Sequence, residues 1–226
     1  MLVFAHRGAR SLSLENTVRA FRLGLRNGAV GLESDVRVTA DGVPVLAHGA
    51  RTITGLTIAR RTRARLPRWV PSLADLYEGC GTDYELSLDV RDDAAIPAVL
   101  AVAGDYDATH RLWLVTESWE AAVQWRTTHG DGFRLAHSVP QLPDDLPAHA
   151  TRLAAGGIDV LNAPARCWTA DTVETCHDAE LMAFGWRVLS RRTRRRAEQV
   201  GLDGIYTDWP WLLAAATDGQ PVRATT

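Results

Sequence analysis

Residues 31–38 read GLESDVRV and point to the fold class, because they combine the pattern of a β-strand with two acidic residues. Side chains alternate between the two faces of a strand, so Glu33 and Asp35 are predicted to point to the same side. Seven other short apolar runs recur along the chain, and stretches with helical spacing separate them. The eight predicted strands cover residues 2–5, 31–38, 84–90, 111–116, 133–137, 158–162, 181–189 and 204–207.

The stretches between these runs predict helices. One of them places four apolar residues at i, i+4, i+7 and i+11, on a single helix face: Leu14, Val18, Phe21 and Leu25. Ser72 and Asp75 have the spacing of a capping box. Later N-caps are predicted at Ser118, Thr169 and Ser190. Eight strands alternating with about seven helices predict an α/β fold, a single (β/α)₈ TIM barrel, with a doubly wound open sheet as the alternative.

Two segments interrupt the alternation. Asp41-Gly42 lies between two short extended stretches and predicts a tight hairpin. Residues 49–70 carry arginines and prolines without a clear period, and predict a short insertion after the second strand rather than a second domain. The barrel domain is therefore expected to span residues 1–216, and residues 217–226 are expected to form a flexible tail.

The composition excludes several classes of protein. The chain has 226 residues, of which 46% are hydrophobic and 23% charged, as expected for one globular domain. Its 25 basic and 27 acidic residues leave a net charge of −2, which gives no bulk attraction to nucleic acid. The chain has no lysine, so Schiff-base chemistry is excluded. No apolar run reaches the length of about 18 residues that a transmembrane segment needs, and no signal-peptide pattern is present, so a cytoplasmic location is expected.

Polar side chains gather where the predicted strands end. His6 and Arg7 follow the first strand, His48 follows the hairpin, and Asp89 and Arg91 end the third predicted strand. In a barrel these strand ends share the face that holds active sites. Three carboxylates from two strands suit a hard divalent cation, two arginines suit a phosphate, and two histidines suit acid–base chemistry. The combination indicates phosphodiester cleavage.

The chain also resembles the glycerophosphodiester phosphodiesterase family. The resemblance covers nearly the whole chain and implies a TIM barrel that uses a divalent cation, Mg²⁺ or Ca²⁺, to hydrolyse glycerophosphodiesters to an alcohol and glycerol 3-phosphate. The motifs occur in the family's order: HRG at 6–8, ENT at 15–17, GLESDV at 31–36, TADG at 39–42, His48, PSL at 71–73, LDVR at 88–91 and GLDGIYTD at 201–208.

The resemblance implies a role for each candidate site residue. It implies metal ligands at Glu33, Asp35 and Asp89, and an acid–base pair at His6 and His48. Phosphate contacts are implied at Arg7 and Arg91, and Trp186 is implied to lie against the organic part of the substrate.

Three positions differ from the family pattern. Gly49 stands where an aspartate usually follows the second histidine, so a carboxylate that orients His48 must come from elsewhere. Asp89 stands in place of glutamate, and Arg91 in place of lysine. Because the insertion is short, the resemblance does not imply which glycerophosphodiester is the substrate. A small-molecule phosphodiester is expected.

Two alternative functions remain open at this stage. One is a lysophospholipase D activity, with a longer apolar chain held near Trp186. The other is a catalytically silent barrel that binds phosphodiesters. A charge cluster on the helix predicted after residue 190 is either a solvated face or a basic rim that attracts anionic substrates: Arg191, Arg192, Arg194, Arg195 and Arg196.

Overall fold

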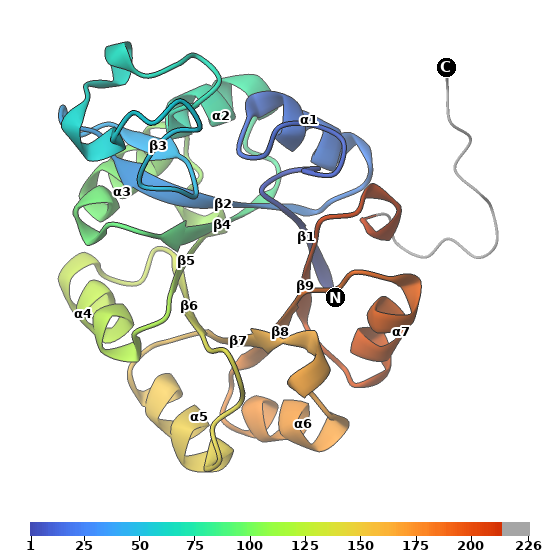
Figure 1. Cartoon of the computed structure of the whole chain (residues 1–226). Coiled ribbons are helices and arrows are strands. Elements are labelled where there is room, and N and C mark those ends of the chain that lie inside the picture. Colours follow the sequence, from blue (N-terminus) through green and yellow to red (C-terminus); the bar gives the residue numbers. More distant parts are fainter. Residues whose placement is uncertain (214–226) are drawn as a thin grey trace.

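The computed structural model describes residues 1–213, which form a closed barrel of eight parallel strands surrounded by helices (Figure 1). Around the ring the strands follow the order β1-β9-β8-β7-β6-β5-β4-β2, and the pairing of β1 with β2 closes it. The short β3 pairs antiparallel with β2, which confirms the predicted hairpin. The prediction of a TIM barrel is confirmed, and the open sheet was wrong because the pairing of β1 with β2 leaves none of the eight parallel strands at an edge. The predicted tail lies outside the described residues.

The strands and helices have the following bounds. The strands are β1 (Leu2–His6), β2 (Gly31–Val38), β3 (Pro44–Leu46), β4 (Glu85–Val90), β5 (Leu112–Thr116), β6 (Arg134–Ser138), β7 (Val160–Pro164), β8 (Met182–Trp186) and β9 (Gly204–Thr207). The helices are α1 (Val18–Arg26), α2 (Leu73–Cys80), α3 (Ile96–Asp105), α4 (Trp119–His129), α5 (Leu146–Ala155), α6 (Ala170–Asp178) and α7 (Arg191–Gln199).

Side-chain caps fix where several helices begin. The four predicted caps are confirmed, since each side chain accepts a hydrogen bond from a backbone N–H of the first turn: Ser72, Ser118, Thr169 and Ser190. The first helix begins later than its apolar pattern predicts. Thr17 caps α1 by accepting from the Ala20 N–H at 3.2 Å, which leaves Leu14 outside the helix and 46% exposed.

The strand predicted over residues 181–189 also ends early. It stops at Trp186 because Arg187 has a φ of 62°, a left-handed conformation that cannot continue an extended strand. Val188 then returns toward the sheet, where its N–H donates to the Tyr206 carbonyl. Residues 187–189, which were predicted to continue the strand, therefore lie outside β8.

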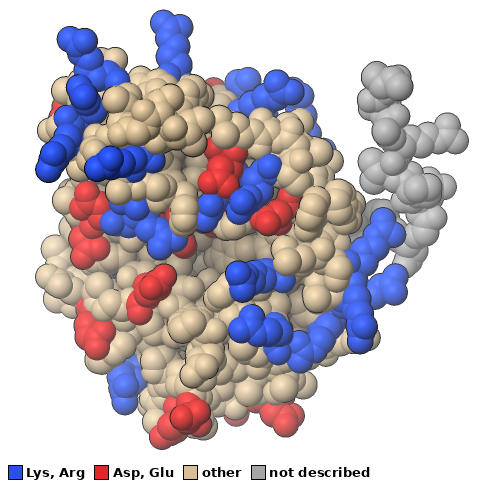
Figure 2. Space-filling model, viewed as in Figure 1, with Lys and Arg blue, Asp and Glu red and all other residues tan. Residues whose placement is uncertain are grey.

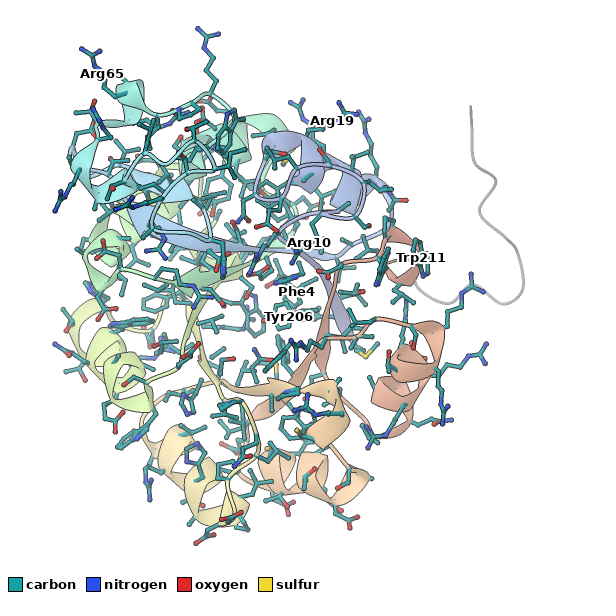
Figure 3. All side chains as sticks on the ribbon, in the orientation of Figure 1. Phe4, Arg10, Arg19, Arg65, Tyr206 and Trp211 are labelled. Carbon is teal, nitrogen blue, oxygen red and sulfur yellow. The ribbon has the colours of Figure 1, made fainter. Side chains whose placement is uncertain are left out.

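Aromatic side chains fill the interior of the barrel. Phe4 stacks on Tyr206 with ring centroids 5.0 Å apart, and Trp113 lies 5.3 Å from Phe184. Phe4 and Tyr206 are seen inside the ring of strands in Figure 3. These buried rings fill the barrel interior and exclude water from it. The polar residues at the C-terminal ends of the strands therefore lie against an apolar layer.

The insertion after β3 has a small core of its own. Residues 49–70 contain two 3₁₀ turns, Ile58–Arg60 and Arg63–Arg65, and pack against the β2–β3 hairpin. The buried residues of this core are Val45, Ile58, Leu66 and Val70. The insertion thus packs against the hairpin at one edge of the barrel. Within residues 1–213, no helix is both long enough and apolar enough to cross a membrane.

Candidate active site

The turn after β1 carries the first two site residues. Gly8 has a φ of 75°, and a Cβ there would lie 2.6 Å from the backbone carbon of Ala20 on α1. The close approach of this turn to α1 therefore requires glycine. Arg7 is also left-handed, with a φ of 53°. The turn directs the Arg7 N–H to Glu33 Oε2 at 2.8 Å and leaves His6 at the end of β1.

Three carboxylates meet across β2 and β4. The parallel register sets Asp35 directly beside Asp89, and Glu33 lies two residues before Asp35 on the same side of β2. One carboxylate oxygen from each residue lies within 4.8 Å of the other two. The side chains of Asp35 and Glu33 are almost fully buried, whereas that of Asp89 is 33% exposed. The structure therefore brings together the three predicted metal ligands.

Burial, together with the neighbouring charges, shifts the pKa values of these three carboxyl groups. Burial, followed by the charges of Asp89 and Asp35, raises the pKa of Glu33 well above its ordinary value. Burial and the charge of Asp35 raise the pKa of Asp89 to about 7. Burial opposes ionisation of Asp35 too, but the His48 hydrogen bond and the charge of Arg7 lower its pKa. A divalent cation among these oxygens would favour the ionised form of all three, so the donor set fits a hard metal ion.

Each predicted acid–base histidine has a carboxylate partner. His6 Nδ1 lies 2.6 Å from Asp208 Oδ1, and its Nε2 lies 3.7 Å from Glu33 Oε2. His48 Nδ1 lies 2.9 Å from Asp35 Oδ1, and its side chain remains 47% exposed. His6 thus lies beside the acidic cluster at Glu33, and His48 contacts it at Asp35.

Asp35 supplies the orienting carboxylate that Gly49 lacks. A Cβ at Gly49 would lie 2.9 Å from the Arg51 carbonyl oxygen, so a larger residue there would require the loop to shift. Asp35 contacts the His48 ring from the neighbouring strand instead. The carboxylate that contacts His48 therefore comes from β2 and not from position 49.

Both predicted phosphate-contacting arginines border the cluster and are paired with carboxylates. Arg7 donates from Nη1 to Glu15 Oε1 at 2.9 Å, and its Nε lies 3.3 Å from Asp35 Oδ2. Arg91 donates from Nε to Asp35 Oδ1 and from Nη2 to Asp89 Oδ2, each at 2.9 Å. Acidic and basic side chains gather around the central hollow of this face (Figure 2).

Three residues that contact the site were not among the predicted site residues. Asp208, which contacts His6, stands 202 positions away from it, and its only signal was membership of the GLDGIYTD motif. Asn16, from the ENT motif, is buried with a φ of 53°, and its Nδ2 lies 3.4 Å from Asp35 Oδ2. Arg10, labelled in Figure 3, lies 3.9 Å from Asp208 through its Nε. These contacts depend on the closure of the barrel, which a local pattern does not report.

Trp186 stands apart from the other predicted residues. It is the last residue of β8, which β9 separates from β1. Its ring packs against the aromatic barrel interior, and its buried Nε1 has no hydrogen-bond partner within residues 1–213. Trp186 therefore forms one wall of the barrel mouth.

Known proteins resemble this chain in sequence and in fold. Residues 6–74 match the model of the glycerophosphoryl diester phosphodiesterase family. The bovine protein named "Glycerophosphodiester phosphodiesterase 1" is 52% identical over 44 residues, which cover 20% of this chain and 13% of that relative. "Probable glycerophosphodiester phosphodiesterase 2" of Mycobacterium tuberculosis is 26% identical and matches 94% of this chain and 89% of its own length.

A solved structure shares the fold over almost the whole chain. A phosphodiesterase from Oleispira antarctica superimposes with a TM-score of 0.80 at 19% identity, covering 94% of this chain and 95% of that one. The matched residues 6–74 include five of the predicted site residues: His6, Arg7, Glu33, Asp35 and His48. The chain is thus similar to the glycerophosphoryl diester phosphodiesterase family in sequence over residues 6–74, and to a solved phosphodiesterase in fold over almost its whole length.

Proposed function

We propose that this chain is a metal-dependent phosphodiesterase that hydrolyses glycerophosphodiesters to an alcohol and glycerol 3-phosphate. The observation that carries the proposal is the convergence of three carboxylates from β2 and β4 between two histidines. The Oleispira antarctica structure contains the product sn-glycerol-3-phosphate, which supports a small phosphodiester as the substrate here.

Glu33, Asp35 and Asp89 are the residues that would hold the cation. All three donors are carboxylate oxygens, which suits Mg²⁺ or Ca²⁺ and disfavours softer metals. When bound, such an ion supplies positive charge that neutralises phosphate oxygens.

Arg7 and Arg91 provide the protein's own positive charge at the phosphate. Their guanidinium groups already lie at the acidic cluster, where carboxylates fix their positions. Planar guanidinium groups match phosphate oxygens with two parallel hydrogen bonds. They stabilise the charge that develops on those oxygens as the new P–O bond forms.

His6 and His48 divide the proton transfers. One ring removes the proton from the attacking oxygen, which belongs to water or to the neighbouring glycerol hydroxyl of the substrate. The other ring gives a proton to the alkoxide that leaves as the old P–O bond breaks. Where the glycerol hydroxyl attacks, the product is a cyclic phosphate, and water then breaks one P–O bond of that cycle to give glycerol 3-phosphate. Asp208 acts as a positioning residue, because it holds His6 Nδ1 at 2.6 Å and leaves Nε2 toward Glu33.

The test is an assay of glycerophosphocholine hydrolysis with Mg²⁺, with Ca²⁺ and with a chelator. We expect turnover that needs the metal and a loss of several orders of magnitude in His6→Ala. His177→Ala is the matched control, because His177 also pairs with an aspartate, Asp203, at the opposite end of β9. Wild-type turnover in His6→Ala would refute the assignment.

Lysophosphatidylcholine in the same assay tests the alternative lysophospholipase D activity, which uses the same residues with a longer apolar chain. Metal binding without turnover of any diester would instead support the catalytically silent barrel. The cytoplasmic location and the domain boundary at residue 216 stay predictions.

A further inference from the structure

A second concave site adjoins the barrel mouth. The loops after β7 and β8 and the first turns of α7 enclose a cavity of about 240 Å³. Its apolar walls include Pro164, Trp186 and Leu189, the last of which is 50% exposed. Three arginines also line it, and none of its lining residues is acidic: Arg166, Arg187 and Arg196.

The positive charge of this cavity is not neutralised by neighbouring carboxylates. Arg196 donates from Nη2 to the Trp168 carbonyl at 2.8 Å and from Nη1 to the Ala165 carbonyl at 3.2 Å, so its guanidinium is held in place. Within residues 1–213, none of the three arginines forms an ion pair with a carboxylate. Arg7 and Arg91 differ, since both are paired at the acidic cluster. The cavity thus presents positive charge that no carboxylate of the described residues neutralises.

The turn at Arg187 determines which headgroups the cavity can accept. Its left-handed backbone, with a φ of 62°, brings the guanidinium to 5.5 Å from the centre of the Trp186 ring. A quaternary ammonium group binds most favourably over an aromatic ring face, but the Arg187 guanidinium already lies over the Trp186 ring. The three guanidinium groups would also repel its positive charge. The cavity therefore disfavours a cationic headgroup such as choline.

Trp186 connects the cavity to the catalytic end of the barrel. Its ring packs on the aromatic interior and also lines the cavity. Only β9 separates β8 from β1, which carries His6. Figure 2 shows basic side chains extending from the central hollow toward α7. A diester whose phosphorus lies at the acidic cluster would extend one substituent in this direction.

We propose that the cavity binds the leaving-group alcohol and selects an alcohol that carries a second anionic group, a phosphate or a carboxylate. This proposal rests on the proposed phosphodiesterase function. Arg166 and Arg187 bind the second anionic group from the exposed rim, Arg196 adds a fixed charge, and the apolar walls pack against the carbon atoms of the alcohol.

A matched pair of substrates tests the selection. We expect kcat/KM to be about tenfold or more higher for glycerophosphoinositol 4-phosphate than for glycerophosphoinositol, mainly through KM, with glycerophosphocholine the poorest. Arg166→Gln/Arg187→Gln should abolish the advantage of the phosphorylated substrate. The control, Arg191→Gln/Arg195→Gln, removes the same charge from exposed positions of α7 outside the cavity and should retain that advantage.

Three outcomes would overturn the proposal. Equal kcat/KM values for the two inositol substrates would show that the cavity does not recognise the second phosphate. An equal loss in both double variants would indicate long-range attraction by the basic rim. A preference for lysophosphatidylcholine over every other substrate would show that the cavity holds an apolar chain.

A binding measurement separates this proposal from the proposed function. If the wild-type protein hydrolyses no diester with either metal, the phosphodiesterase assignment fails. Calorimetric titration with inositol 1,4-bisphosphate then tests the cavity alone. Binding that Arg166→Gln/Arg187→Gln abolishes and the α7 control retains would support an anion site, and undetectable binding to the wild-type protein would refute it.

Discussion

Replacement of Asp208 by asparagine tests how the chain orients His6, the histidine proposed to act in catalysis. Asp208 Oδ1 lies 2.6 Å from His6 Nδ1. Burial opposes ionisation of Asp208, but the hydrogen bond and charge of His6 lower its pKa, so the carboxylate is ionised at neutral pH. An ionised acceptor fixes the proton on Nδ1 and leaves Nε2 free to face the acidic cluster. The Asp208→Asn substitution would retain the shape of the side chain without its charge.

The expected loss follows from the strength of this contact. A hydrogen bond to a charged group contributes about 1.5–3 kcal/mol. If the transition state loses that amount, kcat/KM falls by about 10- to 150-fold. We expect the fall mainly in kcat, because Asp208 holds the ring rather than the substrate. Steady-state kinetics on glycerophosphocholine with saturating metal measures both parameters.

Asp203→Asn provides the matched control. Asp203 Oδ2 lies 2.9 Å from His177 Nε2, but this pair stands before β9 whereas Asp208 follows it. The control should lose stability without losing kcat. A kcat in Asp208→Asn within a factor of two of the wild-type value, with the protein folded, would refute the positioning role. Equal losses of kcat in the two variants would refute it as well.

Three other measurements test the site and the fold. A saturating divalent cation at 100 times its Kd should stabilise the protein by about 2.7 kcal/mol, and Glu33→Gln should lose most of that gain in a thermal melt; an unchanged gain would remove Glu33 from the metal site. Burial and the charge of His149 lower the pKa of His137 to about 4 from an ordinary value near 6.5, so stability is lost as the pH falls from about 6.5 toward 4, by up to about 3 kcal/mol. Urea midpoints at pH 7 and pH 4 should show a smaller pH effect in His137→Gln than in the wild type, and equal effects would contradict the assignment. Gly8→Ala should destabilise by about 2–3 kcal/mol through its 2.6 Å backbone contact, whereas Gly42→Ala, with a similar φ and open space, should cost about 1 kcal/mol; equal urea midpoints for the two variants would show that the close contact does not matter.

Local sequence determined most of the barrel's elements and two of the three carboxylates of the acidic cluster. Alternation within residues 31–38 places Glu33 and Asp35 on one side of β2, whatever lies around them. Ser72 and Asp75 begin α2 because both hydrogen bonds of the capping box form within four residues. Such features were predictable because the interacting groups are close along the chain.

Only the closed barrel decided the remaining contacts of the site. His6 contacts Asp208 because β1 pairs with β9, although the two residues lie near opposite ends of the sequence. Asp35 reaches both His48 and Arg91, which no local spacing indicates. The end of β8 at Trp186 likewise follows from the left-handed turn at Arg187, which the apolar run through residue 189 conceals. Sequence determines which side chains a strand presents to one face, but barrel closure determines which of them meet, because those contacts join residues that are distant along the chain.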